Sequence, residues 1–238
     1  MTRTNSTVLI TGSSRGLGFA FAEWYQQNGW NVIATARSVA KADKLIGLNP
    51  YRILEVDTAD EASIRKAAKD LEGEDIDLLI NNAGICLRED FYTTTRETLL
   101  EQFTVNTVGP FLVAQAFIPH VKAAATSKGS AKIVHVSSGL GSITHGPAYA
   151  NGGLTGYCVS KAGLNMVHAS LATTIKGENI NVASLSIHPG YVSTDMNGEA
   201  PGTITPTESV TAMVSVITNA TLEDNGKFFS YDGTVIPW

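Results

Sequence analysis

Cysteine is scarce in this chain of 238 residues, which contains only Cys86 and Cys158. Two cysteines cannot build a disulfide framework, so we expect a reduced, cytoplasmic protein. The first six residues lead almost directly into the strand-like run at residues 8–10, so we expect no signal peptide. No apolar run approaches the roughly 18 residues that a membrane span requires, so we expect no membrane partner.

A strongly basic surface and a metal-binding pattern are also missing. The chain has 17 lysines and arginines against 22 acidic residues, a formal net charge of −5, and no basic run. This balance argues against a nucleic-acid partner. The five histidines are scattered, and none stands at metal-ligand spacing from another histidine, a cysteine or a carboxylate. We therefore predict no metal site, and the expected partner is a small-molecule substrate.

What the chain does contain is an alternation of short apolar strands and helical patterns. With 43% hydrophobic residues it can bury the core of one large α/β domain, and no linker or repeat suggests a second, so we expect a single domain over residues 1–238. Strands are expected at residues 7–11, 31–36, 51–56, 77–80, 132–137, 181–187 and 226–231. Helices are expected at residues 19–27, 61–71, 96–123 and 207–220, and in the segment that begins at Tyr157.

A glycine-rich turn follows the first expected strand. Gly12, Gly16 and Gly18 stand between that strand and a helical pattern that begins at Phe19. Such glycines let the backbone approach a pyrophosphate closely, and the N-terminus of the following helix offers free N–H groups and the positive end of its dipole. The pattern therefore predicts a dinucleotide site, although its spacing is Gly-x-x-x-Gly-x-Gly rather than Gly-x-Gly-x-x-Gly.

Tyr157 and Lys161 form a second pattern with chemical meaning. They stand four residues apart at the start of a segment in which Leu164, Val167 and Leu171 recur at helical spacing. Positions i and i+4 share one face of a helix, so a phenol and an ammonium lie side by side. A nearby ammonium favours the phenolate, which predicts a tyrosine pKa below its usual value of about 10. Such a tyrosine can give and take a proton near neutral pH.

The two patterns together resemble the short-chain dehydrogenase/reductase family. Three more of its motifs follow in the family's order, namely Asn81-Asn82-Ala83-Gly84, the pair Ser137-Ser138 and Pro189-Gly190-x-x-x-Thr194. The resemblance covers nearly the whole chain and implies a Rossmann-type, doubly wound sheet of seven parallel strands with helices on both faces. The end of the chain and the stretch Ser-Ser-Gly-Leu-Gly-Ser-Ile resemble the C-factor-like and sniffer-like carbonyl reductases of the family.

The resemblance implies a catalytic set of four residues. Tyr157 gives its proton to the oxygen of a ketone or aldehyde, while Lys161 lowers the tyrosine pKa and holds the nicotinamide ribose. Ser138, the second of the serine pair, donates a hydrogen bond to the carbonyl oxygen. Asn106 interrupts the long helical pattern. The family places this asparagine at a helix irregularity, where it binds a water that links the lysine to solvent.

The expected cofactor is NADP(H) rather than NAD(H). The second strand ends in Ala36, where NAD-preferring members of the family carry an acid, and Arg37 follows it. Arg15 adds a cation within the glycine turn, and two guanidiniums can bind a 2′-phosphate in fork geometry. By resemblance, the rest of the cofactor site consists of Gly12, Ser14, Gly16, Leu17, Gly18, Asp57, Thr58, Asn82, Ala83, Gly84, Tyr157, Lys161, Pro189, Gly190, Val192 and Thr194.

The implied activity is that of an NADPH-dependent carbonyl reductase. One alternative is an NADP-dependent alcohol dehydrogenase that works mainly in the oxidative direction, because the same residues serve both directions. Another is a non-catalytic, dinucleotide-binding regulatory or signalling protein, since fold does not imply function. The intact set of four catalytic residues weighs against the regulator. By resemblance we also expect a homodimer or homotetramer, formed through the helix that begins near Tyr157 and the helix before it.

Two segments are expected to border the substrate. The glycine and proline content of residues 139–156 predicts a loop, and this loop is expected to line the substrate cleft because it links Ser138 to Tyr157. His145, Tyr149 and Asn151 are its candidate substrate contacts, although a position in a disordered surface loop explains each of them equally well. Residues 195–206, with few large apolar side chains, are expected to form a mobile lid.

Overall fold

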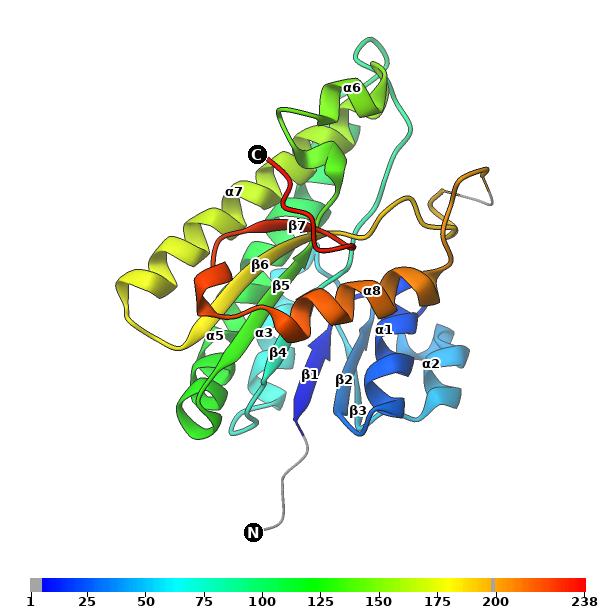
Figure 1. Ribbon diagram of the computed structural model, residues 1–238. Helices are drawn as coiled ribbons and strands as arrows, with labels where there is room; N and C mark the ends of the chain where they lie inside the picture. Colours follow the sequence, from blue (N-terminus) through cyan, green and yellow to red (C-terminus); the bar gives the residue numbers. More distant parts are fainter. Residues whose placement is uncertain (1–5, 198–199) are drawn as a thin grey trace.

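Seven parallel strands form the centre of the molecule, and their carboxyl ends lie at one edge of a single sheet (Figure 1). The computed structural model describes residues 6–197 and 200–238. The spatial order is β3-β2-β1-β4-β5-β6-β7. The strands are β1 (Thr7–Ile10), β2 (Asn31–Ala36), β3 (Arg52–Glu55), β4 (Leu78–Asn81), β5 (Ala131–Val136), β6 (Val182–His188) and β7 (Phe228–Ser230). This arrangement confirms the expected Rossmann-type, doubly wound sheet.

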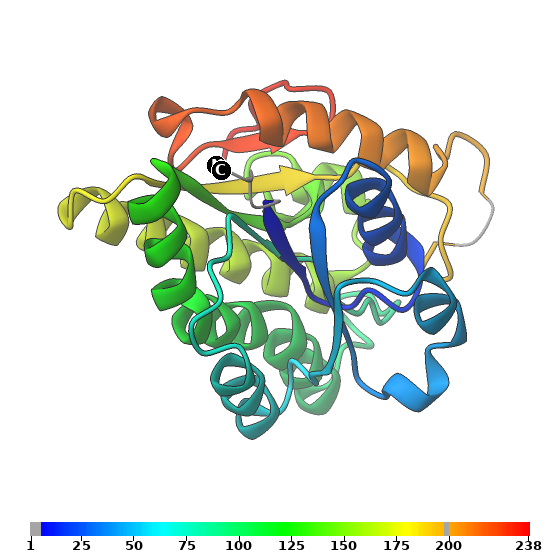
Figure 2. The ribbon, with the colours of Figure 1, turned by 90° about the horizontal axis from the view of Figure 1, so that it is seen from below.

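Helices cover both faces of the sheet, as Figure 2 shows. On one face α1 (Gly16–Gln27) packs beside α8 (Pro206–Asn219). On the other face lie α3 (Glu61–Asp70), α5 (Gly109–Lys128) and α7 (Thr155–Gly177). No helix in the described part of the chain is both long enough and apolar enough to cross a membrane.

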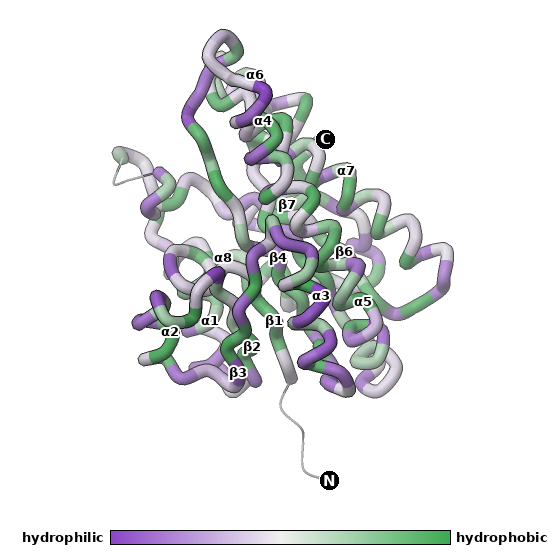
Figure 3. Tube along the Cα trace, turned by 180° about the vertical axis from the view of Figure 1, so that it is seen from behind, coloured by the Kyte–Doolittle hydropathy of each residue, from purple (hydrophilic) through white to green (hydrophobic). Residues whose placement is uncertain are grey.

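The core is divided into two layers by the sheet. Along β1, the buried side chains of Val8 and Ile10 join the apolar cluster under α1 and α8, whereas Leu9 joins the cluster under α3 and α5. This alternation follows from the two-residue period of a strand. It also explains why β1 is a continuous apolar run, which Figure 3 shows in the hydrophobic colour.

The strand order reverses between β1 and β4, which are neighbours in the sheet although two strands separate them in the sequence. In open α/β sheets, ligands bind outside the carboxyl ends of the strands at such a switch point. The turns that follow β1 and β4 therefore meet at this edge. They are the glycine-rich turn and the Asn81–Gly84 motif.

The long helical pattern at residues 96–123 is one helix with a local irregularity. α4 (Arg96–Phe103) continues through the π-helical turn η2 (Thr104–Val108) into α5. Asn106 lies in the middle of η2 and is fully buried. The helix irregularity that the family resemblance implied at this asparagine is therefore present, and π-helical turns are frequent at functional sites.

The sequence does not predict five short helices among the described residues. They are η1 (Val39–Lys41), α2 (Asp43–Leu48), η3 (Gly139–Gly141), α6 (Gly146–Ala150) and η4 (Leu222–Asp224). Each spans fewer than two helical turns, so no apolar period can reveal it. Two of them lie in residues 139–156, where the glycine and proline content favoured an irregular loop.

The C-terminal residue Trp238 packs over β7 and α7. Its ring stacks on Phe228 with the ring centroids 5.5 Å apart, and its centroid lies 5.7 Å from that of His168. The Trp238 carbonyl oxygen accepts hydrogen bonds from the Thr144 N–H and hydroxyl at 3.1 and 2.7 Å. This residue therefore holds part of the segment that links Ser138 to α7.

Two histidines are buried beside this tryptophan. His135 in β5 and His168 in α7 have no exposed surface, and their ring centroids lie 5.8 Å apart. Burial lowers the pKa of His168 from 6.5 to about 4, because a charged imidazolium would lose its hydration there. The pKa of His135 is also lowered, first by burial and then by the nearby groups His168 and Lys161, whose protonated forms would repel a second positive charge.

These pKa shifts predict a loss of stability in mild acid. An unfolded histidine takes up a proton near pH 6.5, whereas folded His168 stays neutral down to about pH 4. The unfolded state therefore binds more protons between these values, and the free energy of unfolding falls as the pH falls. Between about pH 7 and about pH 4.5, the free energy of unfolding should fall by about 1–3 kcal/mol less in His168→Gln than in wild type, as measured by urea unfolding. Parallel stability curves for variant and wild type would contradict this expectation.

Candidate active site

The glycine turn joins β1 to α1 and is fastened to the turn after β4. Gly12 and Gly16 have φ angles of +69° and +54°, left-handed values that favour glycine. Thr11 Oγ1 accepts hydrogen bonds from the N–H groups of Asn82 and Ala83 at 3.0 and 3.1 Å. Asn82 Nδ2 donates to the Thr11 carbonyl oxygen at 2.9 Å. The two motifs that the sequence analysis singled out thus form one surface.

This surface has the shape and polarity of a dinucleotide cradle. A Cβ at Gly18 would collide with the Gly12 carbonyl oxygen and lie 2.5 Å from Asn82 Nδ2, so the turn can close only around a glycine. α1 begins at Gly16 with Arg15 as its N-cap, and neither a side-chain cap nor an acidic residue occupies its first turn. Its N–H groups and positive dipole end therefore remain open to a pyrophosphate.

Two further residues of the turn have different surroundings. Ser14 lies within the glycine turn, and its side chain is half-buried. Leu17 packs against the apolar cluster under α1 and α8. Its side chain is half-buried and extends the edge of this cluster.

Arg15 and Arg37 are both exposed at the carboxyl edge of the sheet. Arg15 Nη1 lies 3.3 Å from Asp195 Oδ2, and both side chains of this pair are largely exposed. An exposed ion pair of this kind adds little stability, so Arg15 can exchange this partner for another anion. The sequence analysis placed both arginines but did not connect Arg15 with Asp195.

Asp57 and Thr58, which the resemblance includes in the cofactor site, follow β3. Asp57 is half-buried, and its Oδ1 accepts the Ala59 N–H at 2.9 Å. Thr58 is buried, and a Cβ at Gly109 would lie 2.6 Å from its carbonyl oxygen. Thr58 therefore packs against the start of α5, whereas Asp57 is the more accessible of the two.

The segment after β6 returns to the glycine turn from the opposite side. Pro189 and Gly190 form the turn, in which Gly190 has a φ of +85°. Val192 is buried, and a Cβ at Gly16 would lie 3.6 Å from Thr194 Cγ2. The structure thus brings the expected cofactor residues after β6 next to those after β1.

The expected lid at residues 195–206 is in contact with both sides of this site. Residues 198 and 199 lie outside the described residues. Asp195 pairs with the glycine turn through Arg15, and the Met196 carbonyl oxygen accepts a hydrogen bond from Arg88 Nη2 at 3.1 Å. That this segment opens and closes stays a prediction.

Ser138, Tyr157 and Lys161 meet where α7 passes the end of β5. Lys161 Nζ donates to the Val136 carbonyl oxygen at 2.9 Å and lies 5.7 Å from the centre of the Tyr157 ring. The Ser138 hydroxyl is close enough to Tyr157 to influence its pKa. Lys161 is buried and Tyr157 is half-buried, so the three side chains form one enclosed group.

The prediction of a lowered tyrosine pKa is wrong for this environment. Burial raises the pKa of Tyr157 above its usual value of 10.0, and the Ser138 hydroxyl opposes this only in part. Burial also lowers the pKa of Lys161 from 10.5 to about 8. Removing water disfavours the charged form of both groups, and it is the largest influence on the pKa of each. Near neutral pH, Tyr157 is therefore a phenol.

Asn106 connects the π-helical turn to α7. Its Nδ2 donates to the Ile85 carbonyl oxygen at 2.8 Å and to Ser160 Oγ at 2.9 Å, and its Oδ1 accepts the Ile85 N–H at 2.8 Å. Ser160 Oγ in turn donates to the Tyr157 carbonyl oxygen at 2.8 Å. A Cβ at Gly84 would lie 3.1 Å from Asn106 Oδ1, so a glycine at position 84 avoids crowding the Asn106 side chain. The water-binding role that the resemblance implies for Asn106 stays a prediction.

Sequence analysis did not place Cys86 beside Tyr157 and Lys161. This thiol influences the pKa of both Tyr157 and Lys161. Its position two residues after the Asn-Asn-Ala-Gly motif was the available signal. Burial raises the pKa of Cys86 and of Cys158, which lowers the fraction of reactive thiolate in both.

The candidate substrate contacts divide into two groups. Tyr149 lies against the turn after β5, because a Cβ at Gly139 would be 3.7 Å from its Cδ2, and its ring centroid is 5.6 Å from that of His145. Asn151 instead ends α6 with a φ of +47° and is exposed.

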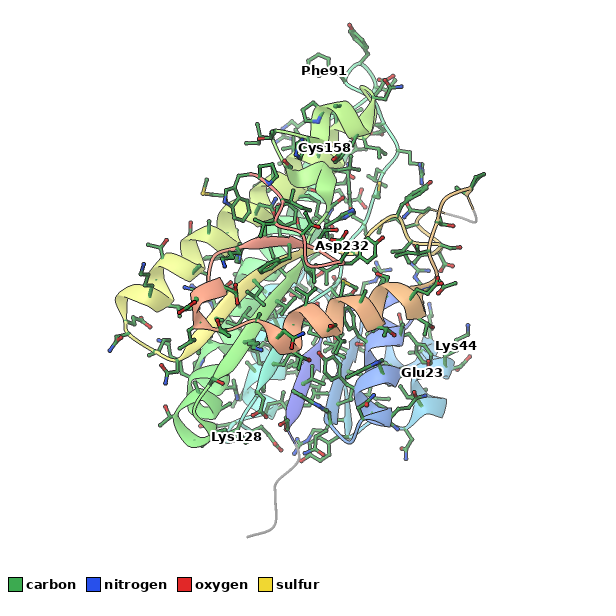
Figure 4. All side chains as sticks on the ribbon, in the orientation of Figure 1. Glu23, Lys44, Phe91, Lys128, Cys158 and Asp232 are labelled. Atoms are coloured by element: carbon green, nitrogen blue, oxygen red, sulfur yellow. The ribbon has the colours of Figure 1, made fainter. Side chains whose placement is uncertain are left out.

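Phe91, which is 74% exposed, lies at the outer tip of the segment between β4 and α4 (Figure 4).

The close packing of the glycine turn yields a test of stability. Gly18→Ala is expected to lower the free energy of unfolding by about 1–3 kcal/mol in urea, because the turn must open to admit the methyl group. Gly47→Ala is the matched control, since Gly47 lies within α2 and an added Cβ meets nothing within 4 Å. This control should be neutral or up to about 1 kcal/mol more stable. Equal stabilities of the two variants would show that the turn tolerates a side chain.

Comparisons with known proteins agree with this geometry. A crystal structure of NADPH-bound carbonyl reductase from chicken fatty liver is 33% identical, with a TM-score of 0.90 over 98% of this chain and 99% of that one. The carbonyl reductase Sniffer of D. melanogaster is 31% identical, with a TM-score of 0.90 over 99% and 100% of the two chains. C-signal of Myxococcus xanthus is 36% identical over 168 residues, which are 68% of this chain and 93% of that protein.

A family model described as short chain dehydrogenase matches residues 6–204, which is most of the chain. The matched range contains the glycine turn, the Asn81–Gly84 motif, Ser138, Tyr157 and Lys161. The chain therefore belongs to the short-chain dehydrogenase family, in which it has sniffer-like and C-signal-like relatives.

Proposed function

We propose that this protein is an NADP(H)-dependent oxidoreductase that reduces a ketone or aldehyde to an alcohol. The observation that carries the proposal is the enclosed group of Ser138, Tyr157 and Lys161 at the end of β5. The site offers a proton donor, a hydrogen-bond donor and a cation, which are the groups that carbonyl reduction requires. The two similar carbonyl reductases, from chicken liver and D. melanogaster, support this reaction class.

The cofactor assignment rests on the cradle and on the arginines. The glycine turn and the N-terminus of α1 suit the pyrophosphate, and Arg15 and Arg37 suit a 2′-phosphate. A short-chain dehydrogenase/reductase structure from Burkholderia multivorans with bound NADP, 26% identical, and the NADPH-bound chicken enzyme support NADP(H). When bound, the nicotinamide supplies the hydride that reduces the carbonyl carbon.

The residues of the chain then complete the reaction. Ser138 donates a hydrogen bond to the carbonyl oxygen and stabilises the negative charge that develops on it. The Tyr157 hydroxyl gives its proton to the same oxygen, so that a hydride on carbon and a proton on oxygen yield the alcohol. The ammonium of Lys161 stabilises the phenolate that is left. The neutral phenol found at Tyr157 is the form that the reductive direction needs.

The size of the assembly is the remaining part of this proposal. Phe111 on α5 and Val159 and Met166 on α7 are exposed apolar side chains on the helices where the family resemblance places subunit contacts. We propose a homodimer or homotetramer on this basis. Sedimentation velocity counts the subunits directly.

Removal of the tyrosine hydroxyl tests the catalytic assignment. Tyr157→Phe should lower kcat by at least about 10²-fold, because it removes the hydroxyl assigned to protonate the carbonyl oxygen, while the Kd for NADPH stays within about threefold. Turnover is followed as NADPH consumption with a panel of ketones, quinones and aldehydes. Wild-type turnover in the variant would sink the assignment. Tight NADPH binding without turnover of any carbonyl by the wild type would favour the non-catalytic alternative.

A charge reversal tests the cofactor assignment. Arg37→Asp places a carboxylate at the end of β2. This carboxylate should repel a 2′-phosphate and accept hydrogen bonds from the hydroxyls of an unphosphorylated ribose. We expect the ratio of kcat/KM for NADPH to that for NADH to fall by at least about tenfold. Fluorescence titration with each nucleotide measures the same preference without turnover. An unchanged ratio would refute the role of this arginine.

A further inference from the structure

Asn165 is a buried asparagine on α7, one helical turn beyond Lys161. It is 4% exposed, and its carboxamide makes three hydrogen bonds to other elements. Its Oδ1 accepts from Ser137 Oγ at 2.7 Å and from Ser186 Oγ at 3.0 Å, and its Nδ2 donates to the Gly141 carbonyl oxygen at 3.1 Å. One side chain thereby joins α7, the end of β5, β6 and η3.

Two of these partners, Ser137 and Gly141, flank Ser138 in the sequence. Ser137 comes directly before it, and Gly141 closes the turn after it by donating its N–H to the Ser138 carbonyl oxygen at 2.8 Å. The Leu140 N–H also donates to Ser138 Oγ at 3.2 Å. Asn165 therefore holds both ends of the short segment that presents the Ser138 hydroxyl.

The direction of Ser138 follows from the same contacts. Successive side chains of an extended segment point to opposite sides, so a Ser137 side chain held toward Asn165 leaves Ser138 facing away from it. On α7, Tyr157, Lys161 and Asn165 follow at intervals of four residues and lie along one face. A Cβ at Gly141 would lie 2.9 Å from the Lys161 backbone, so the turn is seated directly against this face.

We propose that Asn165 is a positioning residue that sets the distance and direction of Ser138 relative to Tyr157 and Lys161. The inference rests on the proposed function of these three residues. It assigns to Asn165 no contact with substrate or cofactor. Any effect of Asn165 on turnover must therefore act through Ser138. A buried polar residue that only stabilises the fold would not depend on Ser138 in this way.

The strand β6 offers a matched control. Ser184 and Ser186 are both fully buried and stand two residues apart, so their side chains face the same side of the strand. Ser186 Oγ bonds to Asn165, whereas Ser184 Oγ lies 2.8 Å from Nδ1 of His168, which is on α7 but farther from the catalytic residues. Ser184→Ala thus removes a similar buried contact between the same two elements without touching the Ser138 turn.

Kinetic non-additivity is the first test. Asn165→Leu should lower kcat with a carbonyl substrate by about 10²-fold, with the Kd for NADPH within about threefold of wild type. In a Ser138→Ala background, Asn165→Leu should cause no further loss, because the residue it positions is gone. Ser186→Ala should lower kcat more than Ser184→Ala at similar loss of melting temperature. Multiplicative losses, or equal losses for the two serines, would overturn the proposal.

Amide hydrogen exchange tests the positioning without any turnover. The amides of Leu140 and Gly141 should exchange at least about tenfold faster in Asn165→Leu than in wild type. Their exchange rates in Ser184→Ala should equal those of wild type. Unchanged exchange in Asn165→Leu would overturn the proposal. The double variant Ser137→Ala and Ser186→Ala replaces Asn165→Leu in both tests if the latter does not fold.

The two proposals fail in different ways. Wild-type turnover in Tyr157→Phe and Ser138→Ala would remove the proposed function and, with it, any catalytic meaning of Asn165. Loss of turnover in those variants together with normal turnover in Asn165→Leu would overturn the positioning role alone.

Discussion

The site depends on how closely α7 approaches the end of β5. Lys161 reaches the Val136 carbonyl oxygen at 2.9 Å, and the turn after Ser138 is so near the helix that only a glycine fits at position 141. This contact brings Tyr157 and Ser138 together although a long segment separates them in the sequence. The parallel sheet does the rest, because it places the ends of β1, β4, β5 and β6 at one edge.

The enclosure that assembles the site also sets its charges. Tyr157 and Lys161 share a helix face, yet each is more affected by the loss of water than by its neighbour. The tyrosine is kept neutral, and the lysine loses part of its preference for the proton. Opposite shifts in two neighbouring groups are typical of residues that exchange protons during a reaction.

Much of the fold and the site could be predicted because the motifs stand at strand ends, and parallel strands bring these ends together. The glycine turn and the Asn81–Gly84 motif meet for this reason. The pairing of Arg15 with Asp195 and the bonds of Asn165 could not be predicted, since they join segments distant in sequence through packing that no local pattern records. The tyrosine pKa was mispredicted because helical spacing reveals a neighbouring charge but not the extent of burial.

The neutral state of Tyr157 gives the two directions of the proposed reaction different starting points. Carbonyl reduction begins from the form that is already populated at neutral pH, with the proton stored on the phenol. Alcohol oxidation needs the phenolate and must first release this proton to solvent. The overall equilibrium is unaffected by the protein, but the pH at which each direction runs fastest is not the same. For the proposed reaction, we therefore expect the pH optimum of oxidation to lie at more alkaline pH than that of reduction.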